Sequence, residues 1–171
     1  MSVTNRRIFT DVFGDIVTNV RSEYDTVNNP QVAPYYLFGQ SLAIKNEIIE
    51  KKISDRYPLI ILGIDSDYVE VDINSRQYEV SFNCWIVDET KKEWYTSDRF
   101  EQVYATVLFP IYELLKEKIQ FSEYVDSFGI QGFKPQVRLF PYWGSSNEQV
   151  LSDPLDAIMV KVSNLLIKNN C

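Results

Sequence analysis

The sequence contains no histidine among its 171 residues and only two cysteines, Cys84 and Cys171, which lie far apart. Histidine is the commonest general base and the commonest metal ligand of proteins, and it joins cysteine in the usual zinc clusters. These absences exclude a histidine-dependent catalytic triad and a Cys/His zinc site. The two separated cysteines also provide no disulfide framework, which is typical of a protein made in a reducing cytoplasm.

Several other signals of common function classes are missing. The six glycines are isolated and form neither a phosphate-binding loop nor a dinucleotide fingerprint. The net charge of −7 disfavours tight nucleic-acid binding, which needs clustered Lys and Arg against the phosphates. There is no run of about 18 apolar residues, and the chain begins with an amphipathic pattern. We therefore expect no cofactor, no membrane partner and no signal peptide.

The composition is that of one globular domain covering residues 1–171, with 45% hydrophobic and 24% charged residues. Apolar residues recur at helical spacing from Ile8 to Val20, which predicts an amphipathic N-terminal helix over about residues 4–22. Gly14 lies inside this helix, where it is unfavourable, and it suggests that a neighbouring element approaches closely.

Two further helices are expected. Residues 35–40 are interpreted as the lead into a helix that starts after Ser41. Another helix is predicted from Ser97 onward, with Asp98 and Glu101 in a capping-box arrangement. Pro110 lies within its apolar stripe and predicts a kink, because proline removes one backbone hydrogen bond.

The middle and the end of the chain predict strands. Residues 78–86 alternate between apolar and polar side chains, and residues 59–62 form an apolar run typical of a strand buried on both faces. Shorter strands are expected near Val69 and over residues 136–140, and a long strand over residues 155–167. Residues 88–94 are interpreted as a charged turn or hairpin tip, and residues 140–144 as an aromatic turn. The order of elements predicts an α+β domain with a mainly antiparallel sheet flanked by helices.

Asp65, Asp67, Glu70 and Asp72 form the densest acidic patch of the sequence. Carboxylates at alternate positions can bind a divalent cation, but the glycine and glutamate of a calcium-binding loop are absent from their places. A solvated turn between strands is therefore favoured. A metal-dependent enzyme that uses Asp65, Asp67 and Asp72 remains an alternative.

Aromatic residues are abundant, with 11 Tyr and 10 Phe, and tyrosine is common at protein contacts. Strict alternation turns Trp85 away from the apolar face of its strand, so it either packs under a helix on the second face of the sheet or is exposed for a partner. The other candidates either cap the core or anchor a neighbouring subunit. The candidate contact residues are Tyr35, Tyr36, Phe38, Trp85, Tyr142 and Trp143.

The succession of segments along nearly the whole chain resembles a known group of proteins. The segments are Tyr36-Leu37-Phe38-Gly39-Gln40-Ser41-Leu42, Arg56-Tyr57-Pro58-Leu59-Ile60, the strand at 78–87, Phe109-Pro110-Ile111-Tyr112, Leu139-Phe140-Pro141-Tyr142-Trp143-Gly144 and a closing strand from Asp156. In this order they resemble the tail-terminator, tail-completion and neck-ring proteins of tailed bacteriophages.

The resemblance implies a non-enzymatic α+β subunit, made in the host cytoplasm, that forms a hexameric or dodecameric ring in the virion. Such a ring joins the portal or adjacent neck and tail proteins at the head–tail junction and lets DNA pass without specific binding. We expect six acidic residues to face the channel or the next ring: Asp65, Asp67, Glu70, Asp72, Asp88 and Glu89. A monomeric adaptor that binds a protein by sheet-edge addition is a further alternative.

Overall fold

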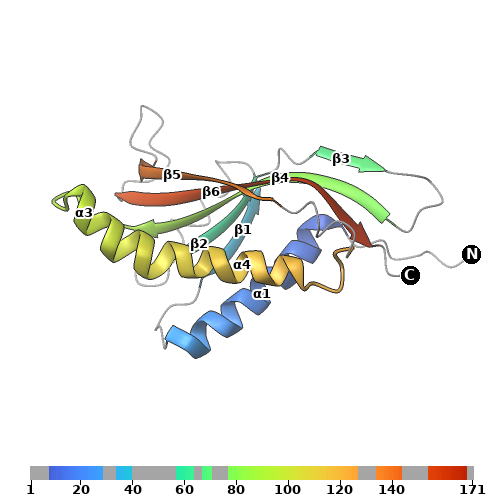
Figure 1. The fold of residues 1–171 in the computed structure, drawn as a ribbon, viewed down its shortest axis with the longest axis horizontal. Coiled ribbons are helices and arrows are strands. Elements are labelled where there is room, and N and C mark those ends of the chain that lie inside the picture. Colours follow the sequence, from blue (N-terminus) through green and yellow to red (C-terminus); the bar gives the residue numbers. More distant parts are fainter. Residues whose placement is uncertain are drawn as a thin grey trace, which may run out of the picture.

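The computed structural model describes residues 8–28, 34–39, 57–63, 67–70, 77–126, 134–143 and 154–168. They form a sheet with a layer of helices on one face (Figure 1). The elements are α1 (Phe9–Asn28), β1 (Tyr35–Gly39), β2 (Leu59–Gly63), β3 (Asp67–Glu70), β4 (Gln77–Glu89), α3 (Thr96–Arg99), the π-helix η2 (Phe100–Leu108), α4 (Phe109–Gln120), β5 (Gln136–Trp143) and β6 (Leu155–Lys168).

The sheet has six strands in the order β1-β2-β4-β6-β5, and β3 also pairs with β4. Strands β1 and β2 are parallel, and every other pairing of the described strands is antiparallel. Strand β6 pairs along one side of β4, so strands β2 and β3 both lie along the other side of β4. Among the described strands, β1 and β5 are therefore the two ends of the sheet order. The predicted α+β class with a mainly antiparallel sheet is confirmed.

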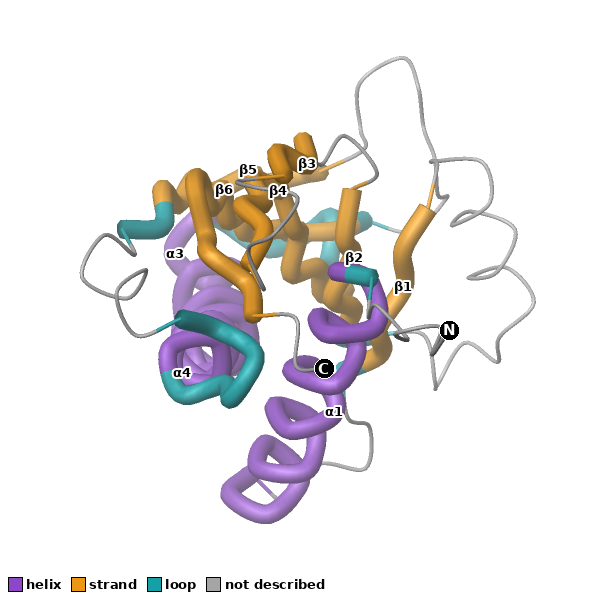
Figure 2. The backbone as a smooth tube through the Cα atoms, turned by 90° about the vertical axis from the view of Figure 1, so that its right-hand side faces the viewer, coloured by secondary structure: helices purple, strands orange, loops and turns teal. Residues whose placement is uncertain are grey.

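The helices cover one face of the sheet, where α1 lies against α4 (Figures 1 and 2). The apolar stripe of α1 is buried, and Phe9 and Phe13 pack on Phe82 of β4 with ring centroids 4.8 and 5.3 Å apart. The helix continues to Asn28, six residues past the predicted end, because Tyr24 adds a further buried turn to the stripe. None of the described helices is long and apolar enough to cross a membrane.

The second helical segment is continuous from α3 through η2 to α4. It begins one residue before the predicted start, and Asp98 is not its N-cap: its carboxylate accepts a hydrogen bond from the Tyr95 N–H at 3.1 Å. At the other junction, the Phe109 N–H bonds to the Tyr104 carbonyl five residues back, and α4 begins at Phe109, next to Pro110, which has no N–H to donate. The bonding thus changes from π to α beside Pro110, and the kink predicted there stays a prediction.

The structure corrects three predictions for the strands. Residues 35–39 form β1, paired with β2, instead of a lead into a helix; the helix expected after Ser41 lies outside the described residues. Asp88 and Glu89 belong to β4 and not to a hairpin tip, because β6 extends far enough to pair with both. Residues 140–143 continue β5 across an irregularity after Phe140, since Leu155 of β6 pairs with Trp143.

The core lies on both faces of the sheet. The larger cluster lies under the helices, and the even-numbered residues of β4 from Tyr78 to Ile86 contribute to it. A smaller cluster lies on the opposite face and comprises Leu37, Tyr57, Leu59, Ile61, Val87, Leu155 and Ala157. Because β2 contributes to both clusters, its predicted burial on two faces is confirmed.

The contact of Phe9 and Phe13 with Phe82 predicts a large effect of truncation. We expect Phe82→Ala to lower the free energy of unfolding by about 3–5 kcal/mol, because it removes the contacts of the Phe82 ring with the two buried rings of α1 and leaves a cavity. Denaturant unfolding followed by circular dichroism measures this change. Phe121→Ala is the matched control: Phe121 is 80% exposed, so its truncation should change stability by less than about 0.5 kcal/mol. Equal losses in both variants would contradict the described core.

Candidate functional site

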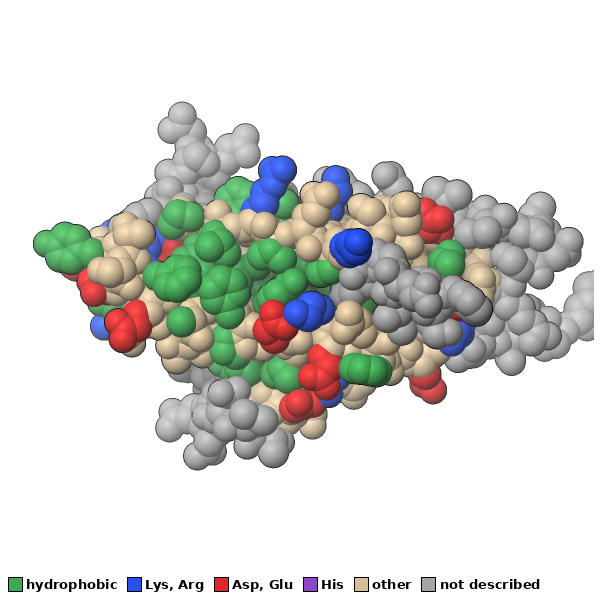
Figure 3. Space-filling model, viewed as in Figure 1, with side chains coloured by type: hydrophobic (Ala, Val, Ile, Leu, Met, Phe, Trp, Pro, Cys, Tyr) green, Lys and Arg blue, Asp and Glu red, His purple; other side chains and the backbone are tan. Residues whose placement is uncertain are grey.

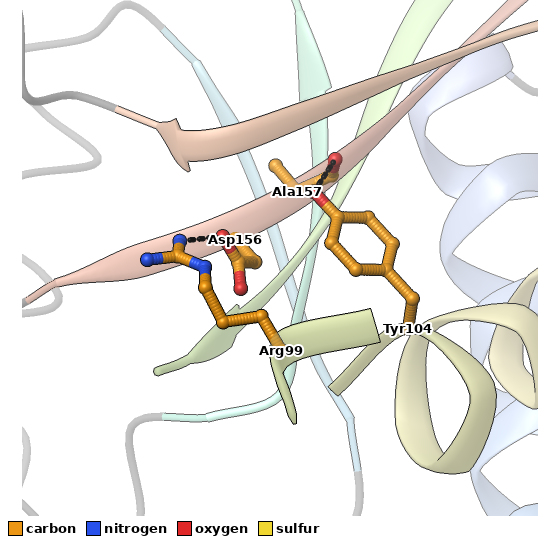
Figure 4. A network of polar contacts seen from close by, with 4 residues as sticks. All are labelled: Arg99, Tyr104, Asp156 and Ala157. Atoms are coloured by element: carbon orange, nitrogen blue, oxygen red, sulfur yellow. Dashed lines mark hydrogen bonds and ion pairs between the residues drawn. The ribbon is translucent and has the colours of Figure 1, made fainter. Parts of the chain in front are cut away.

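A buried ion pair joins the helical layer to the sheet. The guanidinium of Arg99, the last residue of α3, binds the carboxylate of Asp156 on β6, and both side chains are buried (Figure 4). Beside them, the Tyr104 hydroxyl of η2 donates a hydrogen bond to the Ala157 carbonyl at 3.5 Å. Removing two charged groups from water is costly, so the attraction between them must first offset this desolvation. The pair therefore fixes the position of α3 on β6 more than it stabilises the fold.

Asp88 adds a second carboxyl to this region, because it lies directly opposite Asp156 in the β4–β6 ladder. The pKa of Asp88 is raised from 3.8 to about 7, mainly by burial and also by the negative charges of Glu89 and Asp156, although a backbone hydrogen bond from Glu89 lowers it. Burial and the Asp88 charge also raise the pKa of Tyr24 on α1. Asp88 is therefore partly protonated at neutral pH.

The structure places the candidate aromatic residues of β1 against α1. The Tyr36 hydroxyl donates to the Thr10 carbonyl at 3.1 Å, and its ring lies 5.6 Å from that of Phe13. A Cβ at Gly14 would lie 3.3 Å from the Tyr36 ring, so the close approach predicted from this glycine is confirmed. The Arg21 guanidinium lies over the half-buried Tyr35 ring at 5.2 Å.

The remaining aromatic candidates fall into three situations. Phe38 stays 53% exposed at the end of β1, and it stacks on Tyr36. Trp85 packs against Phe140 of β5 at 5.0 Å on the face opposite the helices and is half-buried, so it lies neither under a described helix nor fully exposed, and neither predicted alternative describes it. Tyr142 and Trp143 belong to β5, but their side chains lie outside the described structure.

The acidic candidates separate into two regions. Asp67 and Glu70 are the first and last residues of β3, where they pair with Ser81 and Tyr78 of β4. Asp65 and Asp72 lie outside the described residues, so the structure does not bring the four together. Within the described ranges, no group of three or more His, Cys, Asp or Glu side chains is arranged to hold a metal ion.

Asp88 and Glu89 occupy the opposite end of β4 from β3. Asp88 is largely withdrawn from solvent beside Asp156, and Glu89 is exposed. The sequence pattern predicted that Asp88 and Glu89 belong to one charged turn. The sequence contains no local signal for their different environments, because Asp156 and Arg99 are distant in the chain.

Sequence reasoning missed an exposed apolar surface between β5 and the second helical segment. Phe100, Val137 and Leu139 are 51%, 37% and 43% exposed. Figure 3 shows hydrophobic side chains gathered in this region. We define the edge surface as these three residues with the half-buried ring of Phe109; the buried ring of Tyr104 lies beneath them, next to Phe100 and Phe109.

The contacts of Tyr104 connect the two parts of the edge surface. Its hydroxyl reaches the β6 backbone at Ala157 and lies beside the β5 backbone at Phe140. On the helix, Phe100 lies 6.0 Å from both Tyr104 and Phe109, measured between ring centroids. Val137 and Leu139 pair with the inward-facing Val160 and Ile158, so their side chains project toward the helical layer.

The edge surface could not be found from sequence periodicity. Phe100 fits the apolar stripe of its helix, and residues 136–140 fit a short strand. The exposure of Val137 and Leu139 results from the position of β5 at the end of the sheet order, where its helix-facing side chains extend beyond the helices. A contiguous exposed apolar patch of this kind is typical of a protein contact site.

The buried ion pair predicts a strong effect when one partner is lost. We expect Arg99→Met to lower the free energy of unfolding by about 3–5 kcal/mol, because it leaves the Asp156 carboxylate buried without this cation. Denaturant unfolding at neutral pH measures the loss. Lys116→Met is the control: it breaks the solvent-exposed pair with Glu113 and should cost less than about 1 kcal/mol. A similar small cost for both variants would argue against burial of the pair.

The raised pKa of Asp88 predicts an unusual pH dependence. A carboxyl whose pKa is higher when folded than when unfolded favours folding in its protonated form, so stability falls as pH rises from about 4 to about 8. The shift corresponds to at most about 4 kcal/mol, and partial exposure of the side chain reduces it. Unfolding measured across this range should show a smaller fall for Asp88→Asn than for the wild type. Parallel curves for the two proteins would refute the shift.

No family model matches the chain, and no curated protein matches it. The functional conclusion therefore rests on the fold, the edge surface and the order of sequence segments.

Proposed function

We propose that the chain is a structural protein of the virion of a tailed bacteriophage. In this proposal its copies form a ring at the head–tail junction, as a neck connector or tail terminator. The ring joins the portal to the tail and continues the channel through which DNA passes. The α+β architecture agrees with the proposal, since the resemblance in segment order implies a subunit of this class.

The observation that carries the proposal is the edge surface. Its exposed aromatic and aliphatic side chains lower the solubility of a free subunit. Burial against another protein removes these side chains from water and is favourable. The surface combines an aromatic cluster on a helix with an end strand of the sheet. Interface centres are rich in such aromatic residues and poor in charge. A subunit built for assembly presents this kind of surface.

The charge of the chain supports the same role. The net charge of −7 repels DNA phosphates, so a channel lined by such subunits does not hold DNA by electrostatic attraction. The proposal assigns the acidic segment around β3 and the exposed Glu89 to the channel or to the contact with the next ring.

An adaptor that binds a different protein is the second candidate, and the same edge surface favours it. Strand β5 has one partner among the described strands, so an extended peptide could add to its outer side. The two candidates differ in self-association, because an adaptor needs no contact between its own copies.

Self-association is therefore the property to measure first. We expect native mass spectrometry across a wide concentration range to show closed oligomers of six or twelve subunits, and negative-stain images to show rings. A chain that stays monomeric at every concentration would contradict the ring.

The place of the ring in the virion needs a separate test. Deletion of the coding sequence from the phage genome that carries it should leave capsids and tails unjoined in negative-stain images. Complete particles in the deletion strain would contradict a role at the head–tail junction.

A further inference from the structure

We infer that an extended segment of a different protein adds to the outer side of β5 as a further strand. The side chains of this segment alternate between apolar and acidic. The apolar ones lie on the edge surface, and the carboxylates lie on the opposite face of the sheet. The inference rests on the contact role that the proposed function gives to the edge surface, and it adds the chemistry of the partner.

The outer side of β5 is open to a further strand. Among the described strands β5 pairs with β6 alone, so the backbone groups on its outer side have no ladder partner there. Four consecutive residues, Gln136 to Leu139, have exposed side chains. In β1, at the other end of the sheet order, Phe38 is the one exposed residue. Strand β5 is therefore the less covered of the two end strands.

Two prolines limit where a strand can add. Pro135 precedes the stretch Gln136–Phe140 and Pro141 follows it, and proline has no N–H to donate to a ladder. The register of β5 with β6 also shifts after Phe140. Prolines and irregularities at a sheet edge deter pairing with long edges of other sheets. The stretch between the prolines has the length of a typical strand, so it suits a short added segment.

The face of β5 toward the helices is apolar. Val137 and Leu139 pair with residues of β6 that lie in the core cluster under the helices, so both project to this side. Phe100 extends the exposed apolar area onto the neighbouring helix. Glu101 follows Phe100 and is exposed, so a carboxylate brought to this side would meet a like charge. Apolar side chains of an added strand fit here.

The opposite face of β5 is basic. Arg138 pairs with Met159, and Gln136 pairs with Lys161, so these four side chains project away from the helices. Arg138 and Lys161 are both exposed, and such diagonal neighbours lie roughly 7–8 Å apart. Lys161 also pairs with Asn83 of β4, so neither cation has a carboxylate opposite it in the described ladders. Acidic side chains of an added strand fit on this face.

The two faces select different residues of one strand. Successive side chains of a strand point to opposite faces, so an added strand directs alternate residues to Val137 and Leu139 and the others to Arg138 and Lys161. Main-chain hydrogen bonds hold the strand, and apolar burial supplies affinity. Opposite charges on the basic face select carboxylates. A segment with lysine in place of its acidic residues meets like charge and is rejected.

A second copy of β5 fits this edge poorly. If two copies of β5 paired as antiparallel edges of one continuous sheet, Arg138 of both copies would lie on the same face. Like charges on neighbouring strands are destabilising, and Lys161 adds a further cation to each side. The charge of the edge therefore favours a strand of opposite charge from another protein.

Fluorescence anisotropy of labelled synthetic peptides tests the inference. The probe is a short peptide in which valine and glutamate alternate. One comparison peptide has lysine in place of glutamate, and the other has the composition of the probe with its valines grouped together. We expect the wild type to bind the probe at least about tenfold more tightly than either comparison peptide. Equal affinity for all three peptides would overturn the inference.

Charge variants test the basic face. Arg138→Glu should abolish the preference for glutamate over lysine, and the double variant with Lys161→Glu should reverse it. Lys92→Glu makes the same charge change at an exposed position outside the edge, and it should keep the wild-type preference. Circular dichroism checks folding, and Arg138→Gln replaces Arg138→Glu if the reversal prevents folding; it should narrow the preference. An unchanged preference in folded variants of Arg138 and Lys161 would refute the selection of carboxylates.

Methylated peptides test addition as a strand. The N–H groups of alternate residues point to the same edge of a strand, so N-methylation of the valines blocks one edge of the probe and N-methylation of the glutamates blocks the other. Because one edge pairs with β5, one methylated peptide should bind at least about tenfold more weakly and the other should bind as the probe does. Losses in both peptides, or in neither, would overturn the added strand.

A pair of serine variants tests the apolar face. Leu139→Ser should weaken binding of the probe, because Leu139 is exposed on the side that receives the valines. Phe121→Ser, at an exposed position just after α4, is the control and should bind the probe as the wild type does. Equal binding by both variants would contradict the contact with the edge surface.

Native mass spectrometry with and without the probe separates this inference from the proposed function. We expect rings that persist and carry bound peptide. Rings that form but do not bind the probe would refute the inference and leave the ring proposal standing. A probe that dissolves the rings would show that a second copy occupies β5, which also overturns the inference. A monomer that binds the probe would contradict the ring and support the added strand.

Discussion

The long ladder between β4 and β6 is the constraint on which the rest of the structure depends. The two strands pair from Gln77 with Lys168 to Glu89 with Leu155. This pairing fixes which side chains face the helices, because alternate residues of each strand share a face. One irregularity interrupts the ladder between Val80 and Phe82. The left-handed Asn164, with φ of 56°, lies in this region, and its N–H binds the Ser81 hydroxyl at 3.0 Å.

Sequence periodicity predicted the two strands of this ladder, because the signal for each strand is local, but it did not predict that they pair. The alternation from Tyr78 to Ile86 and the apolar pattern after Leu155 both follow from burial of one strand face under helices. Strand β1 had no such signal: residues 35–39 do not alternate, and their pairing depends on β2, which lies some twenty residues further along. The burial of Asp88 could not be predicted from the sequence either, since it depends on residues that are remote in sequence.

The buried ion pair also determines which neighbouring side chain of the helix is exposed. Arg99 turns toward Asp156, and Val103, one helical turn later, turns into the core. Phe100 follows Arg99 directly, so the helical rotation of about 100° per residue directs it away from the core. Its exposure beside β5 is thus a consequence of the pair. A candidate contact residue that periodicity assigned to the core becomes part of the edge surface through an interaction between distant segments.

The charge of the chain limits how such subunits can assemble. Copies with a net charge of −7 repel one another, so the driving force for a ring must come from apolar burial at the contact. At physiological ionic strength, interactions between exposed charges are screened beyond about 8 Å. Repulsion between whole subunits is therefore weakened more than attraction between opposite charges in direct contact. In an assembly of such subunits with another protein, the exposed apolar residues of the edge surface would supply most of the affinity.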